Sequence, residues 1–269
     1  MPLRSIVMIP AHGAGLDEAL ASAADAIAFT LADTSTSLAE LRQLASAGLT
    51  RVAEAAKTGL AVVNHPRTQL LRDDVHALVG SHLKGVILPH AVDPQDIRDL
   101  AVALRELELR HAIEPGEIAA YPVIDTARGL LRAAEIVHAA PRVAGLVFDS
   151  RAYAQDIGAR QEETGPRLAY ARGAVVAAAR AFEKRPLIAA QPLQIAHLAQ
   201  YGFAGVVLPD ARAVAQANAA FTPQAAAIDL AQRQISAYDA ARAEGAWVAR
   251  LDSQVVDAHT ARKARQAFE

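Results

Sequence analysis

Polar side chains with chemical potential follow each of eight short apolar runs in this sequence. They are His12, Asp33, Asn64–His65, His90, Asp125, Asp149, Gln191 and Asp210. Carboxylates, imidazoles and amides are the groups that bind hard cations and transfer protons. Asp and Asn also cap helices and form turns, so each residue taken alone is equally well explained as a cap. The prediction of a site therefore depends on the convergence of the whole set.

Asp125 and Asp149 are the pair predicted to bind a metal, because they follow neighbouring apolar runs. Several carboxylates and imidazoles facing one cavity repel or desolvate one another unless a cation, a cationic ligand or shared protons compensate. Mg²⁺ or Mn²⁺ is one such solution, since these ions accept carboxylate, water and substrate oxygens. Because histidine also binds transition metals, a softer ion remains an alternative to Mg²⁺ and Mn²⁺. The chain has no cysteine, so thiolate ligands and disulfides are excluded.

The apolar runs are rich in Val and Ile, as fully buried strands are, and they alternate with longer segments of helical period. The predicted strands are Ser5–Pro10, Ala26–Leu31, Leu60–Asn64, Gly85–Pro89, Ala119–Ile124, Val143–Phe148, Leu187–Gln191 and Gly205–Pro209. Eight strands alternating with helices predict the α/β class and a (β/α)8 TIM barrel. The ends of such strands meet at one mouth, which brings the polar residues together.

Helical periodicity predicts four helices of the outer ring, Ser37–Ala47, Pro94–His111, Thr126–Ala139 and Gly165–Glu183. Asp93-Pro94 and Thr222-Pro223 are typical helix starts. No linker or low-complexity stretch interrupts the alternation, so residues 1–269 are predicted to form one TIM-barrel domain. Residues from about 223 to 269 form a C-terminal helical extension, with helices at 223–243 and 255–268. These helices pack either on a neighbouring subunit or on their own barrel.

Composition limits the partners that this chain can have. Its 269 residues carry a net charge of −2, and Lys and Arg are dispersed among Asp and Glu, so nucleic acid is not expected as a partner. The apolar stretch near the start, ending at Pro10, is too short for a signal-peptide core or a membrane span. The expectation is a cytoplasmic protein without a membrane partner.

A central segment resembles the signature of the citrate lyase beta-subunit-like proteins, the HpcH/HpaI aldolase superfamily. It runs Val-Ile-Asp-Thr-Ala-Arg-Gly-Leu-Leu over residues 123–131 and continues as Arg-Val-Ala-Gly-Leu-Val-Phe over 142–148. Supporting matches in chain order are Arg4-Ser5 with Pro10, Ala24-Asp25-Ala26 leading to Asp33, residues 85–89, Asp156-Ile157-Gly158, Tyr170-Ala171-Arg172, Asn218 with Phe221-Thr222-Pro223, and Val256-Asp257-Ala258. The resemblance covers nearly the whole chain.

This resemblance implies a TIM barrel, commonly a homotrimer, that cleaves or forms a carbon–carbon bond in 3-hydroxyacyl-CoA thioesters. Substrates of that type are citryl-, malyl- and citramalyl-CoA, and a keto acid is released or consumed together with acetyl-CoA. Mg²⁺ is the usual cofactor. It also implies that Asp257 reaches a neighbouring subunit's active site as an acid or base. Asp125 stands where the family has a metal-binding Glu, one methylene longer.

Several of the family's charged residues are replaced in this chain. The second metal carboxylate falls at Ala152, with Asp149 or Ser150 as substitutes, and an arginine that holds substrate charge falls at Val62. A lysine becomes His90, and only Asp33 remains of a Glu-Asp pair. The positive charge of the family's site is largely lost.

Two hypotheses of different class follow. In the first, the protein is a divergent metal-dependent lyase, with Asp125 and Asp149 for metal, and His90, Asp257 and Asp33 as catalytic groups. Arg128 and Asn64 then bind substrate, although Arg128 could equally pair with Asp125. In the second, the barrel is catalytically degenerate and binds a small molecule or a partner protein. The introduced Asp and His residues favour the first, and the lost Arg and Lys favour the second.

Overall fold

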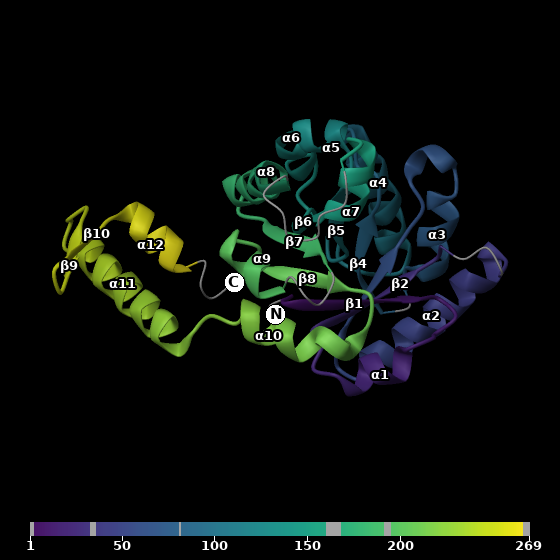
Figure 1. Ribbon diagram of the computed structural model, residues 1–269, viewed down its shortest axis with the longest axis horizontal. Helices are drawn as coiled ribbons and strands as arrows, with labels where there is room; N and C mark the ends of the chain where they lie inside the picture. The colour runs from purple at the N-terminus through teal and green to yellow at the C-terminus, as the bar shows by residue number, and fades with distance from the viewer. Residues whose placement is uncertain (1–2, 33–35, 81, 160–167, 191–194, 266–269) are drawn as a thin grey trace. The chain divides into compact units, whose positions relative to one another are not determined.

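The computed structural model describes residues 3–32, 36–80, 82–159, 168–190 and 195–265. Eight parallel strands form a closed barrel in chain order, as Figure 1 shows. The strands are β1 Ser5–Pro10, β2 Ala26–Thr30, β3 Thr58–Val62, β4 Leu83–Leu88, β5 Ala119–Ile124, β6 Gly145–Asp149, β7 Arg185–Ala189 and β8 Gly205–Leu208. The ring closes where Ile6 of β1 lies opposite Val207 of β8. The predicted TIM barrel is confirmed, with strand ends within two residues of their expected places.

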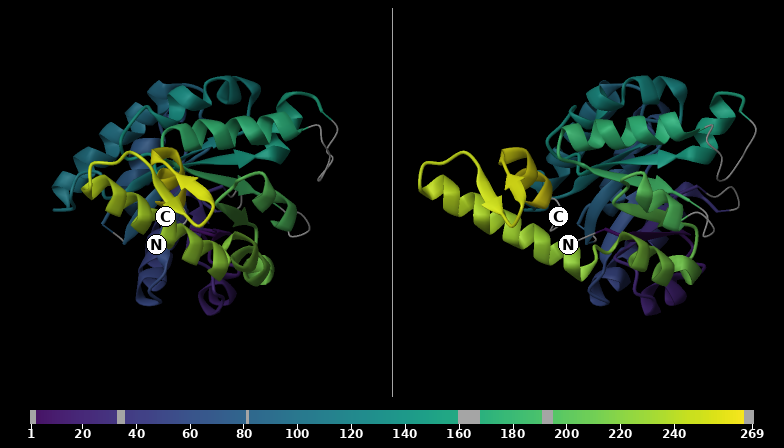
Figure 2. Two further views of the ribbon diagram at one scale, coloured as in Figure 1. Left: turned by 90° about the vertical axis from the view of Figure 1, so that its left-hand side faces the viewer. Right: turned by 60° about the vertical axis from the view of Figure 1, so that its left-hand side comes forward.

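Helices surround the barrel on its outer side, visible from two more directions in Figure 2. They are α1 Leu16–Ala21, α2 Leu38–Glu54, η1 Pro66–Thr68, α3 Leu71–Leu78, α4 Pro94–Arg110, α5 Ala127–Leu131, α6 Ala133–Val137, α7 Ser150–Asp156, α8 Ala169–Ala181, α9 Ile195–Gln200, η4 Ala211–Ala213 and α10 Val214–Phe221. The single helix predicted over 126–139 is instead two helices, because Arg132 leaves the helical conformation at φ −111° and ψ 12°.

Strand alternation divides the core into two apolar layers. Side chains such as Ile6, Leu60 and Leu187 fill the inside of the barrel, and their neighbours along each strand pack outward against the helices. Helix α2 lies very close to β2, since a Cβ added at Gly48 would stand 2.4 Å from the Phe29 ring. The result is a solid barrel interior that leaves only the strand ends for chemistry.

Buried ion pairs close the amino-terminal end of the barrel. Arg4 binds Asp25 across the starts of β1 and β2, with an Nη2–Oδ1 distance of 2.7 Å. Glu108 accepts from both terminal nitrogens of Arg142, at 3.0 and 2.8 Å, and from the backbone amides of Gly116 and Ile118. Burial works to raise the pKa of Glu108, but these donors outweigh it and hold that pKa below its ordinary value.

The chain from Thr222 onward forms a second compact unit, separate in its contacts from Leu3–Phe221. It contains α11 Ala225–Ala243, the hairpin of β9 Ala249–Leu251 and β10 Gln254–Val256, and α12 Ala258–Arg265. The predicted extension thus begins at the expected place, but its last helix starts at Ala258 and not at Val255, which pairs with Arg250 in the hairpin. The single-domain assignment remains a prediction. None of the described helices is long and apolar enough to cross a membrane.

Candidate active site

Asp125 lies at the carboxyl end of β5 and is a buried carboxylate. Its side chain is 4% exposed. One oxygen, Oδ2, accepts from the backbone nitrogen of His90 at 3.0 Å and lies 2.8 Å from His90 Nδ1. The other oxygen, Oδ1, is buried and accepts no hydrogen bond from the described residues. Burying a carboxylate oxygen without a donor is unfavourable in free energy, so this atom is expected to bind a ligand.

Burial raises the pKa of Asp125 above its usual value, and the nearby Asp149 raises it further. The imidazole and backbone amide of His90 act in the opposite direction. Neighbouring carboxylates are stabilised by a shared cation. Asp149 therefore lies near enough to Asp125 to act on it electrostatically, and a metal site shared by the two remains a prediction.

His90 follows β4 in the left-handed backbone conformation, with φ at 55°. Non-glycine residues seldom adopt this conformation, and it turns the backbone N–H of His90 toward Asp125. The imidazole is 69% exposed, and with its Nδ1 directed at the carboxylate its Nε2 is left to face a ligand. His90 and Asp125 therefore form a carboxylate–imidazole pair at the barrel mouth.

Asp149 ends β6 and caps α7. Its Oδ1 accepts from the backbone nitrogens of Arg151 and Ala152, at 3.0 Å each. Its second oxygen accepts no bond within the described part of the chain and remains a possible metal ligand. The structure confirms that Asp149 is a helix cap, and its role as a metal ligand remains a prediction.

Asn64 is held by a buried aspartate that sequence reasoning missed. Its backbone nitrogen and its Nδ2 both donate to Asp74 Oδ2 at 2.8 Å, and Asp74 is fixed in turn by Arg42, whose Nη2 lies 2.7 Å from Oδ1. Asp74 shares its helix with several other polar residues, so its sequence carried no signal of burial. The amide nitrogen of Asn64 has this structural partner, and its carbonyl oxygen is the atom left for substrate.

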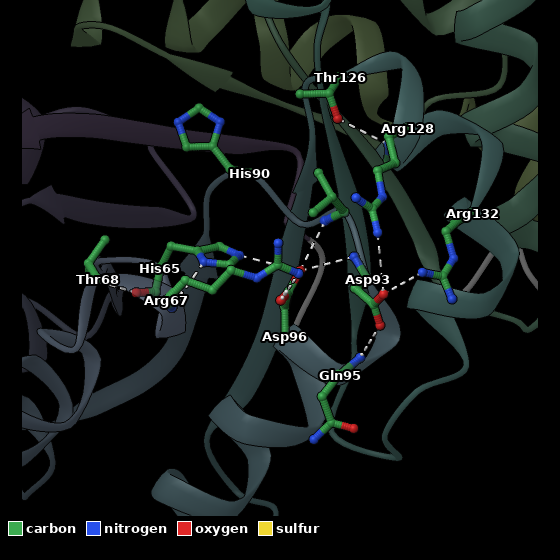
Figure 3. A network of polar contacts seen from close by, with 12 residues as sticks. His65, Arg67, Thr68, His90, Asp93, Gln95, Asp96, Thr126, Arg128 and Arg132 are labelled. Atoms are coloured by element: carbon green, nitrogen blue, oxygen red, sulfur yellow. Dashed lines mark hydrogen bonds and ion pairs between the residues drawn. The ribbon is translucent and has the colours of Figure 1, made fainter.

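Arg128 points to Asp93 and not to Asp125, which corrects the pairing considered from the sequence. Figure 3 shows Arg128 and Arg132 directed at the same Asp93 carboxylate, with Arg128 Nη2 at 3.8 Å from its Oδ2. The reason is local: Asp93 caps α4 beside the start of α5, whereas Asp125 is turned inward to His90. With 63% of its side chain exposed, Arg128 keeps a guanidinium available at the rim.

A second acidic residue, Asp96, joins the same rim. It completes a capping box with Asp93, and its carboxylate also pairs with Arg67 at 3.0 Å and with His65 Nε2 at 3.3 Å. The helix start at Asp93-Pro94 was predicted, and the acid three residues later is the capping-box signal that would have identified Asp96. Figure 3 shows His65 and Arg67 meeting at this carboxylate.

The structure does not test two of the candidate catalytic residues. Asp33 lies outside the described residues. Asp257 lies in the C-terminal unit, is exposed, and caps α12 by accepting from the Thr260 backbone nitrogen at 2.8 Å and hydroxyl at 2.9 Å. These bonds from Thr260 lower the pKa of Asp257. Its role in catalysis remains a prediction.

The donor set suits a hard divalent cation. Among the described residues no group of three or more His, Asp or Glu side chains is arranged to hold a metal. Mg²⁺ does not require such a cage, because it is commonly bound by one or two carboxylates with water and substrate oxygens completing its shell. Asp125 Oδ1 and the second oxygen of Asp149 fit this requirement.

The polar side chains described above lie at the carboxyl end of a closed parallel barrel, which is where TIM-barrel active sites are found. The chain belongs to the HpcH/HpaI aldolase/citrate lyase family, whose model matches residues 5–190. It is 30% identical to a (3S)-malyl-CoA thioesterase of Cereibacter sphaeroides, over 95% of this chain and 90% of that protein. It is 27% identical to citrate lyase subunit beta of Escherichia coli, over 72% of this chain and 67% of that protein.

Solved structures show the same fold at low sequence identity. CitE of Mycobacterium tuberculosis, in complex with magnesium, acetoacetate and coenzyme A, aligns with a TM-score of 0.64 at 22% identity, over 100% of this chain and 98% of that chain. A citrate lyase from Burkholderia xenovorans aligns with a TM-score of 0.74 at 15% identity, over 100% and 91%.

Proposed function

We propose that this protein is a divergent metal-dependent carbon–carbon lyase that acts on a 3-hydroxyacyl-CoA thioester of the citryl-, malyl- or citramalyl-CoA type. Asp125 carries the proposal, because its Oδ1 is buried and accepts from none of the described residues, while His90 contacts its Oδ2. Family membership and relatives named for malyl-CoA and citrate lyase support the substrate class.

Asp125 and Asp149 would hold Mg²⁺ or Mn²⁺. When bound, the metal polarises and orients substrate oxygens and offsets negative charge that develops on them. The two carboxylates and a divalent ion sum to neutrality, so the like-charge repulsion that raises the pKa of Asp125 is removed. The carbonyl oxygen of Asn64 and the exposed guanidinium of Arg128 are the substrate-binding groups in this proposal, for a hydroxyl and for a carboxylate or phosphate.

The lyase reaction needs one base and one acid. A base takes the proton of the C3 hydroxyl, the C2–C3 bond breaks, its electron pair passes to C2 and the thioester carbonyl, and C2 then receives a proton. The products are acetyl-CoA and a keto acid. His90 Nε2 is suited to take the hydroxyl proton, because Asp125 fixes the imidazole through Nδ1. Asp257, or Asp33, is proposed for the transfer at C2.

A second candidate function is hydrolysis of the thioester bond, favoured by the relative named (3S)-malyl-CoA thioesterase. In that reaction His90 Nε2 takes a proton from water, hydroxide attacks the thioester carbonyl, and the CoA thiolate leaves with a proton. A trimer to which Asp257 contributes is a further proposal that rests on the family resemblance. A cytoplasmic location is also proposed, and it rests on the short apolar stretch near Pro10.

Calorimetric titration of metal-stripped protein with Mg²⁺, Mn²⁺ and Zn²⁺, repeated with acetyl-CoA plus pyruvate or glyoxylate, tests the proposal. We expect saturable Mg²⁺ or Mn²⁺ binding that tightens with the organic ligands. Chromatography of the products from malyl- and citramalyl-CoA separates the reactions, since a lyase yields acetyl-CoA and a thioesterase yields free CoA. Absence of binding with every ion and ligand would contradict both and support a degenerate barrel that binds a partner protein.

A further inference from the structure

The turn after β4, residues 90–93, is anchored on β5 in its first half. We call it the His90 turn. The backbone N–H of His90 donates to Asp125 Oδ2 at 3.0 Å, and that of Ala91 donates to a carbonyl of β5 at 3.2 Å. The turn also packs closely on α5, since a Cβ added at Gly129 would stand 2.6 Å from the Ala91 carbonyl oxygen. These contacts fix the place where the turn begins.

The second half of the His90 turn is anchored on Asp96. The backbone N–H groups of Val92 and Asp93 both donate to Asp96 Oδ2, at 3.2 and 2.9 Å. The Asp96 side chain is buried, so these bonds replace its hydration. Because the two amides are consecutive, a single carboxylate oxygen fixes the direction of the chain between them.

Asp96 is itself held from the loop that follows β3. Arg67 Nη2 donates to its Oδ1 at 3.0 Å, and His65 Nε2 lies 3.3 Å from its Oδ2 (Figure 3). The Nδ1 of His65 accepts from the backbone nitrogen of Arg67 at 3.3 Å, which leaves Nε2 to carry the ring proton toward the carboxylate. The buried carboxylate therefore connects the loop after β3 to the His90 turn.

His90 needs such support because its backbone conformation is unfavourable. Its φ of 55° lies in the left-handed region, where a residue with a side chain persists only if the surrounding structure holds it. In this conformation the backbone N–H of His90 and its Nδ1 both reach Asp125 Oδ2, and Nε2 is left for substrate. Release of the turn would allow His90 to leave this arrangement.

We infer that Asp96 is a positioning residue, which holds the amides of Val92 and Asp93 and so keeps His90 paired with Asp125. The inference rests on the proposed function, in which His90 is the base, and adds to it a residue that acts through the His90 turn. Helix capping does not account for all of the arrangement. A capping box needs only the amide of the N-cap residue, Asp93, whereas Asp96 also binds the amide of Val92 before it.

Asp96→Ala removes this anchor. In protein labelled with ¹⁵N in its nine histidines, the backbone amide signal of His90 is identified by its loss in His90→Gln. We expect Asp96→Ala to shift or broaden that signal, because the turn no longer holds the amide against Asp125. With the best thioester substrate, kcat should fall by about 10–100-fold while KM stays near wild type. Asp96→Asn keeps one oxygen for the two amides and should restore most of both readings.

Asp99→Asn is the matched control, since it removes a carboxylate from the same helix. Asp99 accepts from Gln95 Nε2 at 2.7 Å. This variant should keep the His90 signal and kcat of the wild type. Thermal unfolding measures the structural effect of each change. If Asp96→Ala lowers only the melting temperature and leaves both the His90 signal and kcat unchanged, Asp96 is a helix cap and the inference is overturned.

Hydrogen exchange of the wild-type protein tests the anchor without any variant. The amides of Val92 and Asp93 should exchange far more slowly than those of an unstructured peptide, and exchange at the peptide rate would overturn the inference. A His90 signal that depends on Asp96, in a protein without lyase or thioesterase turnover, would remove the proposed function and keep the positioning. A fall in kcat with an unchanged His90 signal would do the reverse.

Discussion

Two buried carboxylates at opposite ends of the barrel, Glu108 and Asp125, are paired in different ways. At the amino end, Glu108 has four donors within 3.0 Å, and Asp25 is bound by both the backbone and the guanidinium of Arg4. At the carboxyl end, Asp125 is similarly buried, but one of its oxygens has no donor in the part of the chain that the structure describes. A buried charged group with all of its hydrogen-bond partners stabilises one structure. A buried carboxylate that lacks a donor for one oxygen favours binding of a ligand there. Glu108 is therefore expected to contribute to stability, and Asp125 to ligand binding.

The largest effect is expected at Glu108. Glu108→Gln should lower the free energy of unfolding by about 3–5 kcal/mol, because Arg142 is then left buried without its counter-charge. Urea denaturation followed by circular dichroism measures the change. Replacement of both partners, Glu108→Leu with Arg142→Met, serves as the control and should cost much less. A single variant as stable as wild type would mean that the amino-end charges are not structural.

The matching change at the other end is Asp125→Ala. It should weaken Mg²⁺ affinity by more than about 100-fold, since even outer-shell partners of a metal are commonly worth 10–100-fold. Stability should change little, because the removed carboxylate was buried at a cost. Calorimetry and urea denaturation provide the two readings, with Asp156→Asn, which retains an acceptor for the Ala127 nitrogen, as the control. Unchanged metal affinity would refute the assignment of Asp125.

Asp257→Asn addresses the C-terminal unit. Asn caps helices as well as Asp does, so the bonds from Thr260 should be retained. If the carboxylate acts as an acid or base, turnover falls by about 100-fold while metal affinity stays near wild type. Steady-state kinetics with the best thioester substrate decide between the roles. Equal turnover in wild type and Asp257→Asn would make this residue a structural cap.

The smallest expected effect is on acid stability. Burial works to raise the pKa of Asp25, but the Arg4 guanidinium and backbone amides lower it below its unfolded value. The unfolded chain then binds more protons, so this stability is complete above the unfolded pKa of about 3.9 and is lost as the pH falls through the lower folded value. Urea denaturation between pH 6 and pH 3 should show a shallower loss in Asp25→Asn. Exposed Asp17→Asn should keep the wild-type slope.

The barrel was predictable because each buried strand is a run of aliphatic residues, and this pattern does not depend on partners distant in sequence. The nearness of Asp125 and Asp149 followed from the same topology. Other features depend on side-chain direction, which periodicity does not contain. The side chain of Arg128 pairs with Asp93. Asn64 donates to Asp74, which the sequence pattern gave no reason to expect to be buried. The left-handed backbone conformation of His90 could not be predicted either, because in a sequence this conformation is usually indicated by a glycine.

The C-terminal unit has a consequence for motion. Its core consists of Tyr238, Val256 and Ala261, with Ala249 and Leu251 packed beside them, and most of α11 is exposed. So few apolar contacts give little resistance to local opening. Backbone amides of α11 and α12 should therefore exchange their hydrogens with heavy water far sooner than those of β1 to β8. One chain would then contain a rigid body and a segment that opens and recloses many times during the life of the folded barrel.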